Sequence, residues 1–159
     1  MATPTYVPIA SATTSSSQSS VTLTGLSSAG YFDYVLFMDV QSSQSIYFDV
    51  NPTGKQIWSS QLFAYSGTPS TVNLYSGNGS PVYFMTHAGN RTQYKMTFIS
   101  AGSSVDIRGA TVEGYSVGGV LYRANLGFQL GTDPIDEIVF STGGAFTDGS
   151  TFRIYGLVA

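Results

Sequence analysis

The chain has 159 residues, enough for a single domain that buries a hydrophobic core. Charged residues make up only 9% of the chain, the net charge is −3, and the basic residues are scattered, so we expect no binding to nucleic acid. The absence of cysteine excludes disulfides and thiolate metal sites. No apolar run approaches the roughly 18 residues of a membrane-spanning helix, so we expect no membrane association.

The first expected element is a short apolar segment, Tyr6-Val7-Pro8-Ile9, which a Ser/Thr-rich stretch separates from the rest of the chain. Two interpretations remain open. The segment is either a first edge strand, where a proline is tolerated, or a mobile arm that docks on a neighbouring subunit. The second interpretation makes these four residues our candidates for an interface with another subunit.

The rest of the chain is dominated by alternation of apolar and polar residues, which collects one kind of side chain on each face of a strand. The residues expected to point inward on this basis are Tyr94, Met96, Phe98, Tyr122, Leu126 and Phe128. Strands are expected at residues 21–23, 34–40, 46–50, 58–65, 72–75, 82–85, 93–98, 105–107, 110–117, 120–130, 138–140 and 152–157. The strand at residues 34–40 is apolar on nearly both faces, which predicts cover on both sides, in part from another subunit.

This pattern predicts an all-β fold, an antiparallel β-sandwich with the jelly roll as its leading version. Turn signals rich in glycine and asparagine separate the strands, and no window reads as an amphipathic helix. We expect residues 1–18 to form the N-terminal arm or edge strand with its Ser/Thr-rich linker, and residues 19–159 to form the sandwich domain.

Residues suited to catalysis or metal binding are sparse. His87 is the one histidine and falls in a predicted turn, where a solvent-facing role is favoured. Asp133, Asp136 and Glu137 could hold a calcium ion, but their spacing does not match an EF-hand loop, which favours a solvated turn. We therefore predict that the protein is not an enzyme and requires no metal or cofactor.

Exposed aromatic residues are the remaining candidates for binding. Tyrosines such as Tyr65, Tyr75 or Tyr115 could stack on sugar rings or line a protein interface. The alternative, which we expect for most aromatic residues of the chain, is a place in the core or at the rim of a small sandwich.

Both ends of the chain resemble a group of small structural proteins of tailed bacteriophages. The N-terminal part of the resemblance is a tyrosine followed by a Pro-Ile-Ala step, here Tyr6 and Pro8-Ile9-Ala10, then a Ser/Thr-rich stretch and an aromatic-led strand beginning at Tyr31. The C-terminal part is Phe146, the Gly149-Ser150-Thr151-Phe152 step and the closing Tyr155-Gly156. The middle of the chain departs from the pattern.

The resemblance implies a virion structural protein, and we expect a capsid cement or decoration protein on the outer surface of the head. Its expected partners are the major capsid protein and two further copies of the chain in a homotrimer, because closed symmetry fits a local threefold axis. The alternative is a tail-fibre or collar component that binds a host-surface receptor or glycan. The chain shows neither heptads nor repeats of a fibre shaft, which favours the head.

Overall fold

The structure is a computed structural model that describes residues 5–15, 18–51, 56–66, 68–75, 82–85, 89–99, 107–117, 119, 121–130 and 133–158. Side chains are described throughout these ranges except in residues 56–66, 68–75 and 82–85 and at positions 107, 122, 128 and 129.

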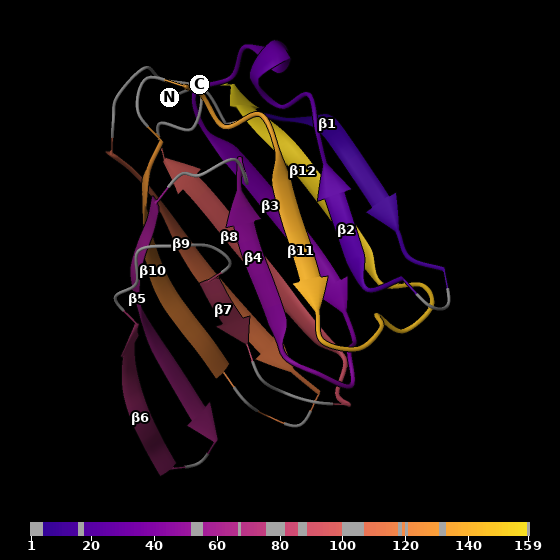
Figure 1. The fold of residues 1–159 in the computed structure, drawn as a ribbon, viewed down its shortest axis with the longest axis vertical. Helices are drawn as coiled ribbons and strands as arrows, with labels where there is room; N and C mark the ends of the chain where they lie inside the picture. The colour runs from indigo at the N-terminus through magenta and orange to yellow at the C-terminus, as the bar shows by residue number, and fades with distance from the viewer. Residues whose placement is uncertain are drawn as a thin grey trace.

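The chain folds into two antiparallel sheets that pack face to face, as Figure 1 shows with the smaller sheet in front. The strands are β1 (Thr5–Thr13), β2 (Ser20–Leu23), β3 (Tyr34–Val40), β4 (Ile46–Val50), β5 (Gln56–Ser66), β6 (Thr68–Tyr75), β7 (Val82–Met85), β8 (Thr92–Ile99), β9 (Ile107–Ser116), β10 (Leu121–Gln129), β11 (Ile138–Thr142) and β12 (Thr151–Val158). The large sheet has the order β1-β12-β3-β8-β9-β10-β5-β6, and the small sheet has the order β2-β11-β4-β7. The predicted all-β sandwich is therefore confirmed.

Helical structure in the described residues is limited to one 3₁₀ turn, η1 (Ser27–Ala29). None of the helical structure in this part of the chain is long or apolar enough to cross a membrane.

The alternation seen in the sequence becomes alternating burial in the strands. In β4 and β11 every second residue is buried, and in β8 the buried positions are Thr92, Tyr94, Met96 and Phe98. The inward direction predicted for Tyr94, Met96, Phe98 and Leu126 is confirmed, since all of them are buried. The side chains of Tyr122 and Phe128 lie outside the described residues.

Most predicted strands agree with the structure within two residues. One exception is the strand expected at residues 72–75, which begins four residues earlier as β6. The other is the region around residue 107, where the sequence suggested two strands, at residues 105–107 and 110–117. Ile107 to Ser116 instead form the single strand β9, because Arg108 and Gly109 continue the pairing with β10 without interruption. Residue 105 lies outside the described residues.

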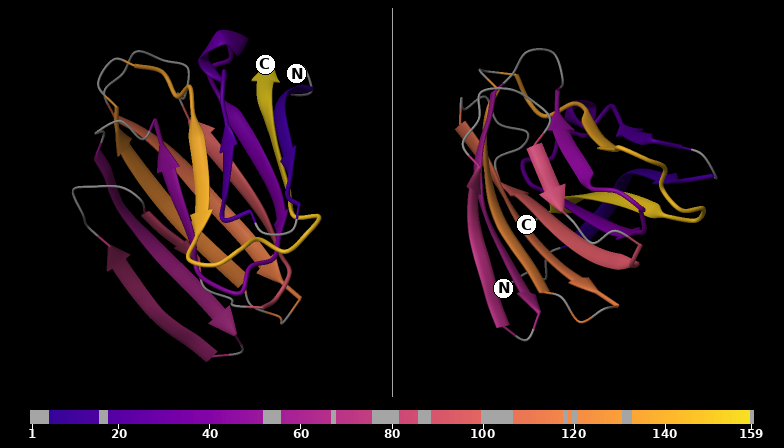
Figure 2. Two further views of the ribbon diagram at one scale, coloured as in Figure 1. Left: turned by 45° about the vertical axis from the view of Figure 1, so that its right-hand side comes forward. Right: turned by 60° about the horizontal axis from the view of Figure 1, so that its bottom comes forward.

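Phenylalanine rings join the two sheets at the centre of the sandwich. Phe140 of β11 lies 5.2 Å from Phe152 of β12, measured between ring centroids, and Phe48 of β4 lies 6.2 Å from Phe98 of β8. Phe48 and Phe140 are neighbours within the small sheet at 5.4 Å. Each of these contacts is close enough to stabilise the fold by about 0.5–1.5 kcal/mol, in addition to the effect of the apolar area that the rings bury. Figure 2 shows the two layers that these rings connect.

Tyr34 carries a buried hydroxyl at one end of this core. Its side chain is fully buried, and its hydroxyl donates a 2.9 Å hydrogen bond to the carbonyl oxygen of Leu26. Burial raises the pKa of this phenol, and the negative charge of Asp136 raises it further.

We expect Tyr34→Phe to destabilise the protein by about 1 kcal/mol at neutral pH, because the carbonyl of Leu26 loses its donor. An unfolded tyrosine ionises near pH 10, whereas the raised pKa keeps Tyr34 protonated in the folded protein. The contribution of Tyr34 is thus complete below pH 10 and is lost as the pH rises through the folded pKa. Urea denaturation of both proteins at pH 7 and above pH 10 measures this, and a stability difference independent of pH would contradict it.

Candidate interaction surface

The four residues proposed for an interface, Tyr6, Val7, Pro8 and Ile9, lie in β1 at the edge of the large sheet. β1 pairs with β12 on one side, and its register shifts between Pro8 and Ala10. The shift marks a bulge, which lets the adjacent residues Ile9 and Ala10 both pack against the core. Tyr6 points to the other face and is 46% exposed. The strand extends to Thr13, into the Ser/Thr-rich stretch.

β1 is unusually exposed for a strand in a sandwich. Among the strands with described side chains, it is the one in which no residue is fully buried. Ile9, Ala10 and Ala12 touch the core but remain partly accessible. An edge strand also carries backbone N–H and C=O groups that no neighbouring strand satisfies on its open side.

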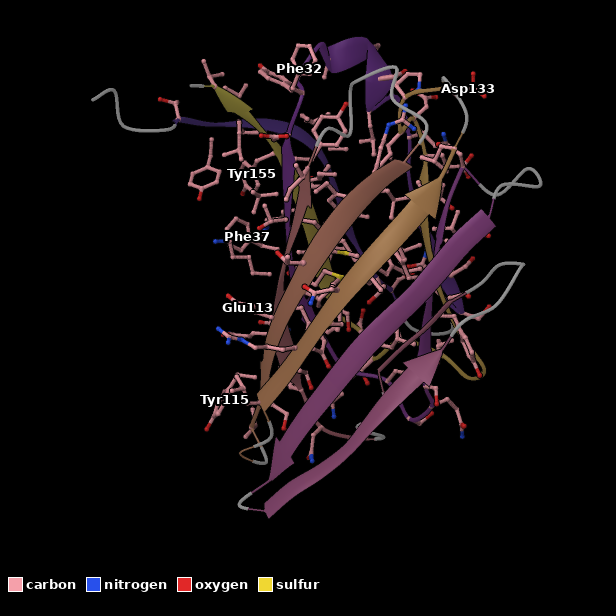
Figure 3. All side chains as sticks on the ribbon, turned by 90° about the vertical axis from the view of Figure 1, so that its left-hand side faces the viewer. Phe32, Phe37, Glu113, Tyr115, Asp133 and Tyr155 are labelled. Atoms are coloured by element: carbon pink, nitrogen blue, oxygen red, sulfur yellow. The ribbon has the colours of Figure 1, made fainter. Side chains whose placement is uncertain are left out.

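Tyr6 belongs to a group of aromatic rings on the outer face of the large sheet. Its ring centroid lies 6.1 Å from that of Phe37 in β3 and 6.2 Å from that of Tyr155 in β12. Phe37 and Tyr155 lie 5.8 Å apart, and all three contacts are edge-to-face. We call Tyr6, Phe37 and Tyr155 the aromatic cluster. Figure 3 shows Phe37 and Tyr155 projecting away from the small sheet.

The expected cover on both faces of residues 34–40 is partial within one chain. Val35 is buried on the outer face, but Phe37, two residues further along the same face, is 39% exposed. Beside Phe37, the Asp39 side chain is also partly accessible. On its outer face, this strand is therefore covered at Val35 and remains partly exposed at Phe37, in the aromatic cluster.

Basic residues share this outer face with the aromatic cluster. Across neighbouring strands, Arg153 lies opposite Phe37, Phe37 opposite Lys95, Lys95 opposite Glu113, and Glu113 opposite Arg123. Arg123 donates to Glu113 at 2.8 Å, but both side chains are more than half exposed, so the pair adds little stability. Figure 3 shows Glu113 and Tyr115 on the same side of the sheet as Phe37.

The clustering of cations was missed when the basic residues were treated as scattered along the sequence. Of the basic residues that the structure describes, Arg108 is buried, Arg91 lies at the rim of the outer face, and the others project from it. The sequence did indicate that these side chains point outward, because Lys95, Arg123 and Arg153 each alternate with apolar residues along a strand. The sequence did not reveal that these strands share one sheet.

The acidic stretch around Asp136 has a structural role in a loop. The Asp136 carboxylate accepts hydrogen bonds from the backbone N–H and the hydroxyl of Ser27. The side-chain oxygen of Asn51 accepts from the backbone N–H groups of Asp136, at 2.9 Å, and Glu137, at 3.0 Å. Among the described residues, Asp133, Asp136 and Glu137 do not come together as a metal-binding group, and neither do any other acidic or histidine side chains.

The remaining candidates from the sequence are only partly described. Tyr115 is 59% exposed on β9. His87 and the side chains of Tyr65 and Tyr75 lie outside the described residues.

Comparisons with known proteins give no relative from which a role could be transferred: no family model, curated protein or solved structure matches the chain.

Proposed function

We propose that the protein is a virion structural protein of a tailed bacteriophage, a capsid cement or decoration protein that bridges major capsid subunits on the outer surface of the head. The proposal combines the two terminal motifs of the sequence with one structural observation, the exposed edge strand β1. A rigid sandwich that holds neighbouring subunits together needs a contact surface and no catalytic site.

The observation that carries the proposal is that β1 is paired on one side and buries none of its residues fully. Such an edge can receive a strand or a loop from another protein, and the main-chain hydrogen bonds would then provide affinity. Pro8 lacks an N–H donor, so it limits how far an unwanted strand can pair along this edge. Tyr6 adds an exposed aromatic ring, the residue type that most often anchors protein interfaces.

The strand order supports the jelly roll as the finer description of the fold. In the small sheet no two neighbouring strands are consecutive in the chain, and the chain crosses between the sheets at every connection except β5–β6, β8–β9 and β9–β10. Repeated crossing of this kind is produced by Greek-key connections, two of which make a jelly roll.

We propose a homotrimer as the assembled form. Three copies that contact several capsid subunits at once must release them together, so modest single contacts give slow dissociation. The low content of charged residues, 9%, limits repulsion between copies.

The test is the occupancy of purified phage particles, measured by quantitative mass spectrometry against the major capsid protein. We expect hundreds of copies of the wild-type chain per particle, and we expect Tyr6→Ser to lower its apparent affinity for empty capsids by roughly thirtyfold, the effect of losing an interface anchor worth about 2 kcal/mol. Tyr115→Ser is the matched control, because Tyr115 is also an exposed aromatic residue but lies on β9, away from the edge.

Three outcomes bear on this proposal. A handful or a few dozen wild-type copies per particle would place the protein in the tail and favour the fibre or collar alternative. Absence from particles would contradict the virion role. Equal binding by Tyr6→Ser and Tyr115→Ser would remove β1 from the contact. Light scattering of the same samples should give three times the chain mass of 16.9 kDa for the free protein.

A further inference from the structure

A hollow on the outer face of the large sheet borders the aromatic cluster at Phe37 and is lined by residues of β12, β3 and β8. Its volume is about 450 Å³, within the usual range for small-ligand sites. The side chains that can contact a ligand there are Phe37, Asp39, Arg91, Gln93, Thr151 and Arg153. They combine one aromatic ring with guanidinium, carboxylate, amide and hydroxyl groups.

Strand pairing fixes the positions of these groups. Arg153 lies opposite Phe37 on neighbouring strands, and Thr151 lies opposite Asp39, which in turn lies opposite Gln93. Cross-strand neighbours of this kind are about 5 Å apart, and the two rows are separated by about 7 Å along the strands. The ring and the polar groups are therefore close enough to contact one or two sugar rings at the same time.

Arg91 holds the carboxylate of Asp39 in place. Its Nε donates to Asp39 Oδ1 at 2.7 Å, and its Nη2 donates to the carbonyl oxygen of Gly149 at 3.1 Å. Because these bonds orient both side chains before a ligand arrives, less conformational entropy is lost on binding.

Arg153 differs from Arg91 in its contacts. Among the described residues it forms no ion pair, and it is exposed at the border of the hollow. A guanidinium group presents parallel N–H donors that match the two oxygens of a carboxylate. Among the described side chains, the strands of the outer face also carry more cations, Lys95, Arg123 and Arg153, than anions, Asp39 and Glu113, although the net charge of the whole chain is −3.

We propose that this hollow binds an acidic saccharide, with its carboxylate on Arg153, the apolar face of a sugar ring on Phe37, and its hydroxyl groups on Asp39, Gln93 and Thr151. Sugar hydroxyls both donate and accept, which suits a site that offers a carboxylate, an amide and a hydroxyl together. A nucleic acid fits less well, because it carries one charge per nucleotide and Asp39 and Glu113 interrupt the basic row. This site goes beyond the proposed capsid role. No residue of β1 lines it, although the Phe37 ring lies beside Tyr6, the proposed capsid anchor.

The test is titration of the purified protein with 3′-sialyllactose, followed by NMR shifts of the backbone amides, with lactose as the neutral control. We expect 3′-sialyllactose to bind with millimolar affinity and lactose to bind roughly tenfold more weakly, the effect of one charge-assisted hydrogen-bonded pair. Arg153→Gln should reduce the affinity for 3′-sialyllactose to that for lactose. Phe37→Leu should weaken both sugars, because it removes the ring and keeps the apolar volume.

Lys95→Gln is the matched control for charge. Lys95 projects from the same face, opposite Phe37, but does not line the hollow, so its removal should change the affinity by less than about twofold. Unchanged thermal unfolding of each variant shows that the fold is intact. Failure of 3′-sialyllactose to bind, equal losses in Arg153→Gln and Lys95→Gln, or tighter binding of triglutamate or of a thymidine oligonucleotide would each overturn the proposal. None of these outcomes depends on binding to capsids.

Discussion

Phe140→Ala is expected to destabilise the protein by about 3–5 kcal/mol, the usual effect of removing a fully buried ring. Phe140 is completely buried, and its ring contacts Phe48 in its own sheet and Phe152 in the opposite sheet. Truncation leaves a cavity between two sheets whose backbones are fixed by hydrogen bonding, so the neighbouring rings cannot close it completely. For a chain of this length the melting temperature should fall by roughly 6–20 °C.

Phe32→Ala provides the control for this prediction, because Phe32 is 69% exposed and its truncation should change stability by no more than about 0.5 kcal/mol. Calorimetry of the two variants measures both losses of stability. A loss below about 1 kcal/mol for Phe140→Ala would mean that this ring does not close the core between the sheets.

Gly114→Ala is expected to destabilise the protein by about 3 kcal/mol, at the upper end of the range for overpacking. A methyl group at this position would lie 2.0 Å from Cδ1 and 2.2 Å from Cε1 of Tyr94, the residue directly opposite on β8. The Tyr94 ring is buried and the backbone of β9 is paired on both sides, so neither partner can move away easily.

Gly109→Ala is the matched control in the same strand. Its added methyl group would have an ordinary contact, 3.4 Å from the carbonyl oxygen of Leu126. We expect a gain of about 0.5 kcal/mol, because alanine restricts the unfolded chain more than glycine does. Combining Gly114→Ala with Tyr94→Leu should recover part of the lost stability, and urea denaturation of the single and double variants measures this coupling. Equal effects of the two glycine substitutions would show that the Tyr94 ring does not rest on Gly114.

The sequence was sufficient to predict the strands and their inward faces, because alternation depends only on neighbours along the chain. Tyr94, Met96 and Phe98 illustrate this, since their shared parity placed all three in the core. The strand order was not predictable in the same way, because it depends on pairing between distant segments. The aromatic cluster shows the difference. Tyr6 and Tyr155 come from opposite ends of the chain and meet Phe37 because β12 lies between β1 and β3.

The structure explains why a glycine follows Tyr155 in the C-terminal motif. The closing Tyr155-Gly156 step places a glycine under the ring of Tyr31, where an added methyl group would come within 2.3 Å of the ring. Tyr31 starts the aromatic-led stretch of the N-terminal motif. The two ends of the resemblance are thus packed against each other, although nothing in their spacing along the sequence indicates it.

The position of β12 between β1 and β3 also has a consequence for folding. β12 pairs with β1 on one side and with β3 on the other, whereas β1 pairs with no other strand of its sheet. During synthesis the residues of β1 are made early, but their partner is made about 140 residues later, a separation that favours slow closure of the sheet. Until β12 pairs with them, β1 and one edge of β3 carry unsatisfied backbone groups, so we expect pairing of β12 to be a late step in the formation of the large sheet.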